Sequence, residues 1–298
     1  MKLGVSTYSL LNAINSGEMT VLDALQWMAD HGAEHVEIVP FGFQLVGNDP
    51  LIDAIREKAA ALNLTISNYA ILADLLKGDE AEFEQEVQRL LREVDIAHRL
   101  GVKLMRHDVS AFRRPFEQNS IVHFERELPR MVTGCRRIAD YAAQFGITTT
   151  LENHGFYVNG SDRVIRLIEA VDRPNFRLTL DTGNFWCIDE DPVVGVHRTV
   201  SYAAMVHLKD FYRRKANAYA GESQMFKCDS GTWFKTSGGS LLRGAIVGDG
   251  DIDLWEIMGI LKRSGYEGYV SIEFEGLEEC KKGTLLGLEN ARRMWEAV

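Results

Sequence analysis

Hydrophobic and polar positions follow two alternating periods along the whole chain. Short runs rich in β-branched and aromatic residues, typical of buried strands, are followed by longer stretches in which apolar residues recur every three or four positions, typical of amphipathic helices. The stretch 82–100 shows the helical period clearly, with Val87, Leu90 and Val94 on one face. The pattern predicts eight strands, at Leu3–Ser9, His35–Pro40, Leu64–Ile71, Val102–Val109, Thr148–His154, Phe176–Gly183, Met205–Phe211 and Tyr269–Glu275.

The helical stretches fall between these strands, and residues suited to helix ends mark several of their boundaries. Gly32, Gly101, Gly146 and Gly265 each stand just past a helical stretch, where a left-handed cap is favoured. Pro192 suits the first position of a helix. The predicted helices are Val21–His31, Leu51–Leu62, Glu82–Leu100, Phe124–Phe145, Asp162–Val171, Pro192–Tyr202, Leu254–Ser264 and Leu285–Ala297.

Eight strands that alternate with eight helices indicate either a closed (β/α)8 barrel or an open, doubly wound parallel sheet. The chain has 298 residues, and a TIM barrel commonly takes ~250 residues. The glycine-rich fingerprints with which open sheets bind nucleotides are absent from the sequence. We therefore predict one TIM-barrel domain that spans residues 1–298.

Residues 212–250 interrupt the alternation. This segment follows the seventh predicted strand and lacks a clear period, but it carries several basic and aromatic side chains. Long loops of this kind usually have a function or are disordered, and aromatic residues argue against disorder. Since loops that follow barrel strands lie at the C-terminal mouth, we expect residues 212–250 to form a lid over that mouth. Its basic and aromatic residues include Arg213, Arg214, Lys215, Tyr219, Phe226, Lys227, Trp233, Phe234, Lys235 and Arg243.

Composition narrows the class of protein. The net charge of −10 argues against a general nucleic-acid binder, which needs a basic face. No apolar run approaches the ~20 residues that cross a bilayer, and the first residues lack the layout of a signal peptide. The four cysteines are widely scattered, so we expect them to be reduced. These features predict a cytoplasmic enzyme with no nucleic-acid or membrane partner.

Candidate metal ligands stand at or near the ends of four predicted strands. The fifth strand has Glu152, the sixth Asp181, the seventh His207 and the eighth Glu273. In a barrel, the C-terminal strand ends converge. Three carboxylates at such a point would repel one another unless a cation lies between them. This mostly oxygen set with one nitrogen suits Mn²⁺, Zn²⁺, Co²⁺ or Mg²⁺.

These residues lie in motifs through which the chain resembles the xylose isomerase-like TIM-barrel superfamily of sugar and sugar phosphate isomerases and epimerases, including the ketose 3-epimerases and hydroxypyruvate isomerase. The resemblance implies that the four residues bind one divalent cation. It also implies that Glu152 and Glu273 are catalytic, exchanging protons with the substrate next to a metal-bound carbonyl through an enediolate. The motifs are Leu151–His154, Leu180–Asn184, His207–Asp210, Gly248–Asp253 and Ser271–Glu273.

Five further residues are candidates for substrate binding. His154 shares a strand face with Glu152, and Lys209 stands two positions beyond His207. Trp186 suits an apolar wall against a sugar face. Glu37 and His107 stand on the second and fourth strands, where structural salt bridges are the commoner role.

Three neighbours of these candidates are expected to form ion pairs. We expect Glu275 to pair with Lys209. We also expect Arg106 and Asp108 to pair outside the barrel or at its rim.

Alternative functions share the same residues. A lyase or dehydratase that acts on a keto-sugar or inosose would begin with the same proton abstraction and then expel a β-leaving group. An endonuclease-IV-type nuclease needs more histidines, and Asn184 stands where those nucleases have one. A non-catalytic metal or sugar binder leaves the two glutamates unexplained. We expect a small sugar or keto-sugar substrate, and a homo-oligomer is compatible with the sequence.

Overall fold

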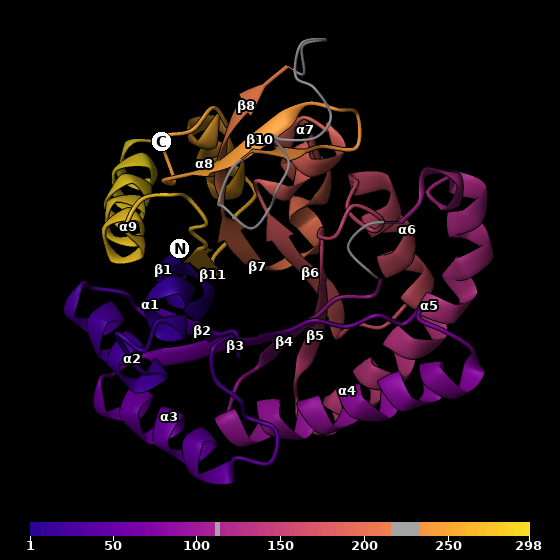
Figure 1. Ribbon diagram of the computed structural model, residues 1–298, viewed down its shortest axis with the longest axis horizontal. Coiled ribbons are helices and arrows are strands. Elements are labelled where there is room, and N and C mark those ends of the chain that lie inside the picture. The colour runs from indigo at the N-terminus through magenta and orange to yellow at the C-terminus, as the bar shows by residue number, and fades with distance from the viewer. Residues whose placement is uncertain (111–113, 216–232) are drawn as a thin grey trace.

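Eight parallel strands close into a barrel at the centre of the computed structural model, which describes residues 1–110, 114–215 and 233–298 (Figure 1). Around the barrel the strands follow the order β1-β11-β7-β6-β5-β4-β3-β2. The barrel strands are β1 (Lys2–Ser6), β2 (His35–Ile38), β3 (Thr65–Ile71), β4 (Leu104–His107), β5 (Thr148–Glu152), β6 (Phe176–Asp181), β7 (Ala203–Leu208) and β11 (Tyr269–Ile272).

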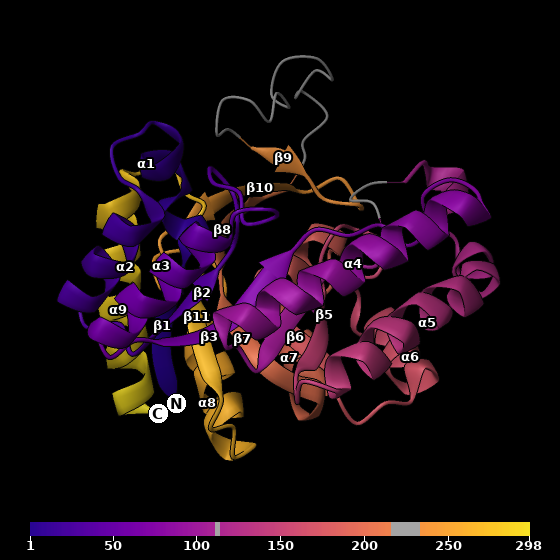
Figure 2. The same cartoon turned by 90° about the horizontal axis from the view of Figure 1, so that it is seen from below.

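Helices form a layer around the outside of the barrel (Figures 1 and 2). Most carry an apolar face that packs on the strands, because the long helices are amphipathic. The N-terminus lies beside β1 and the C-terminus at the end of α9, on the same side of the molecule (Figures 1 and 2). The helices are α1 (Leu11–Asn15), α2 (Val21–Asp30), α3 (Asp49–Ala61), α4 (Glu80–Leu100), α5 (Ile121–Ala143), α6 (Ser161–Val171), α7 (Pro192–Thr199), α8 (Leu254–Arg263) and α9 (Cys280–Ala297).

The predicted TIM barrel is confirmed, and the eight predicted strands each overlap one barrel strand. Gly32, Gly101, Gly146 and Gly265 all have the positive φ angle that their position after a helix predicted. The sequence pattern missed α1 and the short helix η1 (Thr7–Leu10), because the predicted first strand ran on to Ser9. In the described ranges, no helix is both long and apolar enough to cross a membrane.

The described parts of the segment 212–250 contain strands that the sequence pattern did not predict. Its described residues contribute to a three-stranded antiparallel sheet, in which Arg243 of β10 lies opposite Tyr212 of β8. Figure 2 shows this sheet at the barrel end opposite the N-terminus. These strands are too short to show a clear alternation of hydrophobic and polar residues, so the sequence pattern did not predict them. Tyr219, Phe226 and Lys227 lie outside the described residues. The sheet comprises β8 (Asp210–Arg214), β9 (Phe234–Lys235) and β10 (Leu241–Ala245).

Asp210 fastens this sheet to the turn that precedes α8. Its carboxylate accepts hydrogen bonds from the backbone N–H groups of Gly248 (3.0 Å) and Gly250 (2.9 Å). Side chains have little room here, since a Cβ atom on Gly250 would come within 2.2 Å of the Asp210 carboxylate. The Gly248–Asp253 motif is therefore a glycine-dependent turn held by one buried carboxylate.

A buried histidine fills the barrel next to β1. His35 is fully buried, and its Nε2 lies 3.1 Å from the carbonyl oxygen of Val270. A carbonyl can only accept, so Nε2 carries the proton of the neutral ring. Its Nδ1 has no hydrogen-bond partner among the described residues. Gly4 makes the room, because a Cβ atom there would lie 2.6 Å from the imidazole.

The neutral His35 predicts that the protein loses stability in mild acid. Burial lowers the pKa of His35 to about 4 from its ordinary value of 6.5. The unfolded chain binds this proton more readily than the folded protein. The contribution of the neutral His35 ring to the free energy of unfolding is therefore complete above pH 6.5 and is lost as the pH falls toward 4. The expected loss is on the order of 3 kcal/mol. Urea unfolding between pH 7 and pH 4 measures it.

The matched pair of variants isolates this one group. His35→Gln should flatten the pH dependence of the free energy of unfolding over that range. His98→Gln removes an exposed imidazole from α4 and should keep the wild-type slope. An unchanged slope in His35→Gln would contradict the assignment.

Candidate metal centre

The ends of β5, β6 and β7 and the residue after β11 bring four potential ligands together inside the barrel. One ligand atom from each of Glu152, Asp181, His207 and Glu273 lies within 4.8 Å of the other three. All four side chains are buried. The convergence follows from the parallel register, in which Asp181 lies opposite His207. The four residues that the sequence singled out therefore form a group that could hold a metal ion.

His207 is fixed in the orientation that a metal ligand requires. Its Nε2 lies 2.9 Å from Oε1 of Glu37, and Asn68 donates a hydrogen bond to the same oxygen at 2.7 Å. A carboxylate accepts, so Nε2 carries a proton. The other nitrogen, Nδ1, faces Glu273 at 3.6 Å and Glu152 at 3.7 Å. Carboxylates that hold a ligating imidazole in this way are common behind metal sites.

Hydrogen bonds also fix the two carboxylates of β5 and β6. Oδ1 of Asp181 accepts from the backbone N–H groups of Gly183 (2.8 Å) and Asn184 (2.9 Å). The Asn184 amide donates to Oε1 of Glu152 at 3.0 Å. The Asn153 side chain exchanges two 2.8 Å hydrogen bonds with the backbone of Asp181. These contacts leave Oδ2 of Asp181 directed toward the ligand cluster.

Two permanent cations flank the cluster. Arg106 pairs with Glu152 at 2.5 Å, and the Lys209 ammonium lies 2.7 Å from Glu273 and 3.2 Å from Asp181. Burial alone raises the pKa of Glu152, but Arg106 and His207 outweigh it and hold that pKa well below its usual value. Burial and the neighbouring glutamates raise the pKa of Asp181, although Lys209 opposes them.

The arrangement fits a divalent cation. Nδ1 of His207 is buried without a hydrogen-bond partner in the described part of the chain, and Oδ2 of Asp181 contacts the Lys209 ammonium at 3.2 Å. An unpaired buried polar atom is costly, and Nδ1 of His207 faces the three carboxylates of the cluster. Burial and, to a smaller extent, Glu152 and Glu273 raise the pKa of Asp181, so its ionised form is disfavoured without a cation. Three oxygen ligands and one nitrogen suit Mn²⁺, Zn²⁺ or Co²⁺.

A cavity of about 100 Å³ opens onto the cluster. One side is charged and comes from the ligand-bearing strands. The other side is apolar or aromatic and comes from the ends of β1, β2 and β3, where Tyr8 and Phe41 contact edge to face with ring centroids 6.1 Å apart. The cavity is lined by Tyr8, Val39, Phe41, Ala70, Leu72, Arg106, Glu152, His154, His207, Lys209, Glu273 and Glu275.

Two of the five predicted substrate contacts line this cavity. His154 lies with Nδ1 3.2 Å from Asp108, and Lys209 reaches Glu275 at 3.6 Å, as expected. Burial lowers the pKa of His154, but Asp108 outweighs it and raises the pKa overall. Glu37 lies behind the cavity, where it orients His207 instead of meeting substrate.

The other two predicted substrate contacts, His107 and Trp186, do not line the cavity. His107 was expected near substrate, but it points out of the barrel toward Phe176 and its Nδ1 bonds the carbonyl oxygen of Asp108. Trp186 packs under the Arg213 guanidinium, 5.4 Å away, and is absent from the cavity lining. Strand alternation explains the error at β4, because Arg106 takes the inward position and His107 the outward one.

Sequence reasoning also missed three inward-facing groups. Arg106 was expected outside or at the rim, yet it is the buried partner of Glu152. The sequence indicated only that Asn184 stands where endonuclease-IV-type nucleases have a histidine. In the structure the Asn184 amide donates a hydrogen bond to Glu152. Tyr8 was placed within a strand. Arg106 and Asp108 are two positions apart, so they are expected on the same face of the strand. This spacing does not tell whether that face points into the barrel.

Glu37 yields a test of the metal centre. We expect the Glu37→Gln variant to bind Mn²⁺ and Zn²⁺ about tenfold more weakly, because the charge that stabilises and orients the His207 ring is lost. Isothermal titration with each metal measures the change. Glu34→Gln alters an exposed carboxylate three residues earlier and should bind like the wild type. Equal affinities in all three proteins would be incompatible with this role of Glu37.

Comparison with known proteins agrees with this architecture. Inosose dehydratase from Lacticaseibacillus casei is 24% identical over 200 residues, which cover 65% of this chain and 64% of the length of that relative. A probable 3-DHS dehydratase structure from Bacillus anthracis superposes with a TM-score of 0.73 at 18% identity, covering 98% of this chain and 99% of that one.

An epimerase shares the fold to a similar degree. D-psicose 3-epimerase from Clostridium cellulolyticum H10 gives a TM-score of 0.72 at 17% identity and covers 99% of both chains. At these identities the two structures show a shared fold and nothing finer. The family described as the xylose isomerase-like TIM barrel matches residues 25–294. With that match over almost the whole chain, the protein belongs to the xylose isomerase-like TIM-barrel family.

Proposed function

We propose that the protein is a metal-dependent dehydratase that removes water from a cyclic keto-polyol such as an inosose. The observation that carries this proposal is the pairing of bases and proton donors in one small cavity. Glu152 and Glu273 line it together with Lys209, His154 and Tyr8. Elimination needs a base and a separate proton donor for the leaving hydroxyl group, and the cavity offers both. The curated relative named inosose dehydratase supports the same choice.

The proposed reaction divides between these groups. One glutamate takes a proton from the carbon next to the ketone, and the electron pair forms a carbon–carbon double bond as the hydroxyl group on the next carbon leaves. The Lys209 ammonium or the His154 side chain supplies the proton that converts the leaving hydroxide to water. The products are an unsaturated ketone and water, so atoms and electrons balance.

The four ligands would hold a divalent cation, which when bound supplies Lewis acidity toward the ketone. Arg106 and Lys209 keep Glu152 and Glu273 ionised, since each glutamate pairs with one of them. Ionised carboxylates are competent bases. The apolar wall of Val39, Phe41 and Leu72 limits access of water and offers a surface to the ring face of a polyol.

Epimerisation of a ketose is the second candidate. Both glutamates reach the same cavity, as an inversion through removal and return of a proton on opposite faces requires. The D-psicose 3-epimerase neighbour shares the fold.

The two reactions differ in the mass of the product. With Mn²⁺-loaded protein and an inosose in deuterated water, we expect a product lighter by one water and no reaction after the metal is removed. Glu152→Gln should lower kcat by at least about 100-fold, because a base is lost. Mass spectrometry with time measures both.

Glu169→Gln serves as the matched control, since it changes a carboxylate on α6 that bonds Tyr202 far from the cavity. It should retain wild-type turnover. A product of unchanged carbon skeleton and water content that gains one deuterium would favour the epimerase instead.

A further inference from the structure

A further carboxylate lines the metal cavity, and neither the cation group nor the proposed proton transfer uses it. Glu275 stands two positions after Glu273 and lines the cavity, but it is not among the four potential ligands found in the described residues. Its side chain is 26% exposed, against 10% for Glu273. Like charges repel, so this carboxylate adds to the negative charge around the cavity. Its presence there calls for a partner that a carboxylate attracts.

The contacts of Glu275 within the protein are long. Its Oε2 lies 3.4 Å from the Tyr8 hydroxyl and 3.6 Å from the Lys209 ammonium. Lys209 makes closer contacts with Glu273, at 2.7 Å, and with Asp181, at 3.2 Å. Within the described ranges, the Tyr8 hydroxyl is the one hydrogen-bond donor to the Glu275 carboxylate. Since a carboxylate has about four acceptor positions, most of the acceptor capacity of Glu275 is available to a bound molecule.

Neighbouring elements fix the position of Glu275. The Ser9 hydroxyl accepts from the backbone N–H of Phe274 at 2.9 Å and donates to the carbonyl oxygen of the last residue of β11 at 2.9 Å. These bonds join η1, the short helix that includes Tyr8, to the segment that carries Glu275. On the other side, β10 packs so closely that a Cβ atom on Gly244 would lie 2.2 Å from the carbonyl oxygen of Glu275. The carboxylate therefore stands on a segment that is held from both sides.

Tyr8 adds a second acceptor beside Glu275. Glu275 and burial raise the pKa of Tyr8, so the phenol keeps its proton. The Tyr8 ring contacts Phe41 edge to face, with ring centroids 6.1 Å apart. A tyrosine hydroxyl group that donates to a carboxylate can still accept from a ligand. Tyr8 and Glu275 together therefore offer adjacent acceptors to a molecule with several hydroxyl groups.

Both permanent cations that line the cavity already have carboxylate partners. Arg106 contacts Glu152 at 2.5 Å and Asp108 at 3.2 Å. Lys209 lies among three carboxylates, of which Glu275 is the most distant at 3.6 Å. An anionic substituent next to Glu275 would therefore be repelled, and an ammonium group there would meet the charge of Lys209. A neutral hydroxyl group can donate to Glu275 without adding charge.

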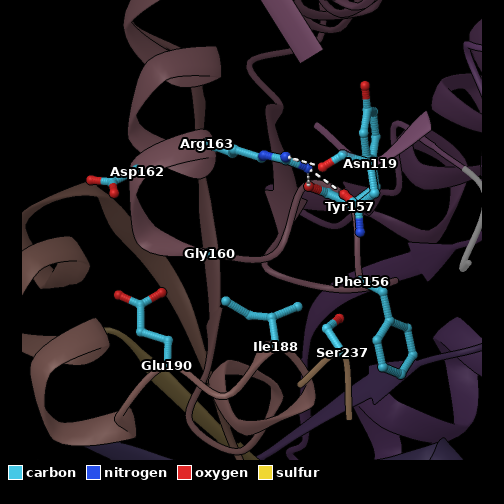
Figure 3. Close-up of a pocket in the computed structure, with 9 residues that line it drawn as sticks. All are labelled: Asn119, Phe156, Tyr157, Gly160, Asp162, Arg163, Ile188, Glu190 and Ser237. Carbon is cyan, nitrogen blue, oxygen red and sulfur yellow. Dashed lines mark hydrogen bonds between the residues drawn. The ribbon is translucent and has the colours of Figure 1, made fainter. Parts of the chain in front are cut away.

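A larger hollow elsewhere in the protein does not supply these contacts. Figure 3 shows this hollow, which has a volume of about 300 Å³. It shares no lining residue with the metal cavity among the described residues. Its Arg163 donates at 2.8 Å to oxygens of Asn119 and Tyr157. The groups that can select the reacting molecule are therefore those of the metal cavity itself.

We propose that Glu275 makes the metal cavity specific for uncharged polyols, by accepting hydrogen bonds from substrate hydroxyl groups other than the one that leaves and by repelling carboxylated rings. The inference rests on the proposed function and narrows its class of substrate to neutral molecules. Hydrogen bonds to a charged acceptor are stronger than those between neutral groups, and like charges brought together oppose binding. One side chain can therefore both favour one class of ligand and exclude another.

The binding of two unreactive cyclohexane polyols tests the inference. The uncharged probe is myo-inositol and the carboxylated probe is quinate. Isothermal titration measures each probe on the wild-type protein and on Glu275→Gln, both at saturating Mn²⁺. We expect the variant to bind myo-inositol at least about fivefold more weakly and quinate at least about fivefold more tightly. Because each probe is compared with itself, its contact with the cation cancels.

Two further variants separate the charge of Glu275 from other effects. Glu275→Asp keeps a carboxylate on a shorter side chain, so it should bind quinate as weakly as the wild type does. Glu267→Gln removes an exposed carboxylate just before β11, at the opposite end of that strand. This control should bind both probes like the wild type.

The outcomes distinguish this inference from the proposed function. If Glu275→Gln changes the affinity for both probes in the same direction, or for neither probe, the inference is overturned, because a side chain that only positions Lys209 would affect both probes alike. The proposed function would stand, since the mass of the product formed from an inosose tests it separately. A wild-type protein that binds quinate but not myo-inositol would contradict the neutral class of substrate.

Discussion

Electrostatic repulsion among three buried carboxylates is the constraint on which the site depends. Glu152, Asp181 and Glu273 surround Nδ1 of His207 at distances of 3.6 to 4.0 Å. Groups of like charge this close, and this far from water, destabilise one another strongly. The barrel tolerates them because Arg106 and Lys209 offset part of the charge and backbone N–H groups hold Asp181. A divalent cation bound among the four residues would offset the remainder.

The same balance explains how the cavity can contain ionised bases and proton donors together. Each glutamate has a cationic partner on its outer side, and His154 has Asp108. These pairs favour the charged forms of the groups, whereas burial opposes them. Adjacent strands therefore bring candidate cation ligands and other ionisable groups together at one cavity.

Sequence predicted the parts of this arrangement that depend on period and order. The eight strands and the positions of the four ligands follow from alternation and from the convergence of parallel strand ends, and the barrel confirms the first of these. It was harder to predict which side chains of a strand point into the barrel. In β4 both Arg106 and His107 are buried, so hydrophobicity did not tell which one faces inward.

Contacts between distant segments were beyond the reach of pattern. Glu37 and His207 are 170 positions apart, and their hydrogen bond depends on β2 and β7 facing each other across the closed barrel. The sequence pattern did not predict the sheet formed by β8, β9 and β10, because its strands are short and one spans only Phe234–Lys235. The sequence did not predict that Tyr8 lines the cavity, because the predicted first strand included most residues of η1.

Anomalous diffraction from crystals soaked with Mn²⁺ tests directly whether the four residues bind a cation. We predict a single strong peak inside the barrel, ~2.0–2.3 Å from one carboxylate oxygen each of Glu152, Asp181 and Glu273 and from Nδ1 of His207. A map with no peak among these four residues at saturating Mn²⁺, or with the ion bound elsewhere on the chain, would contradict it.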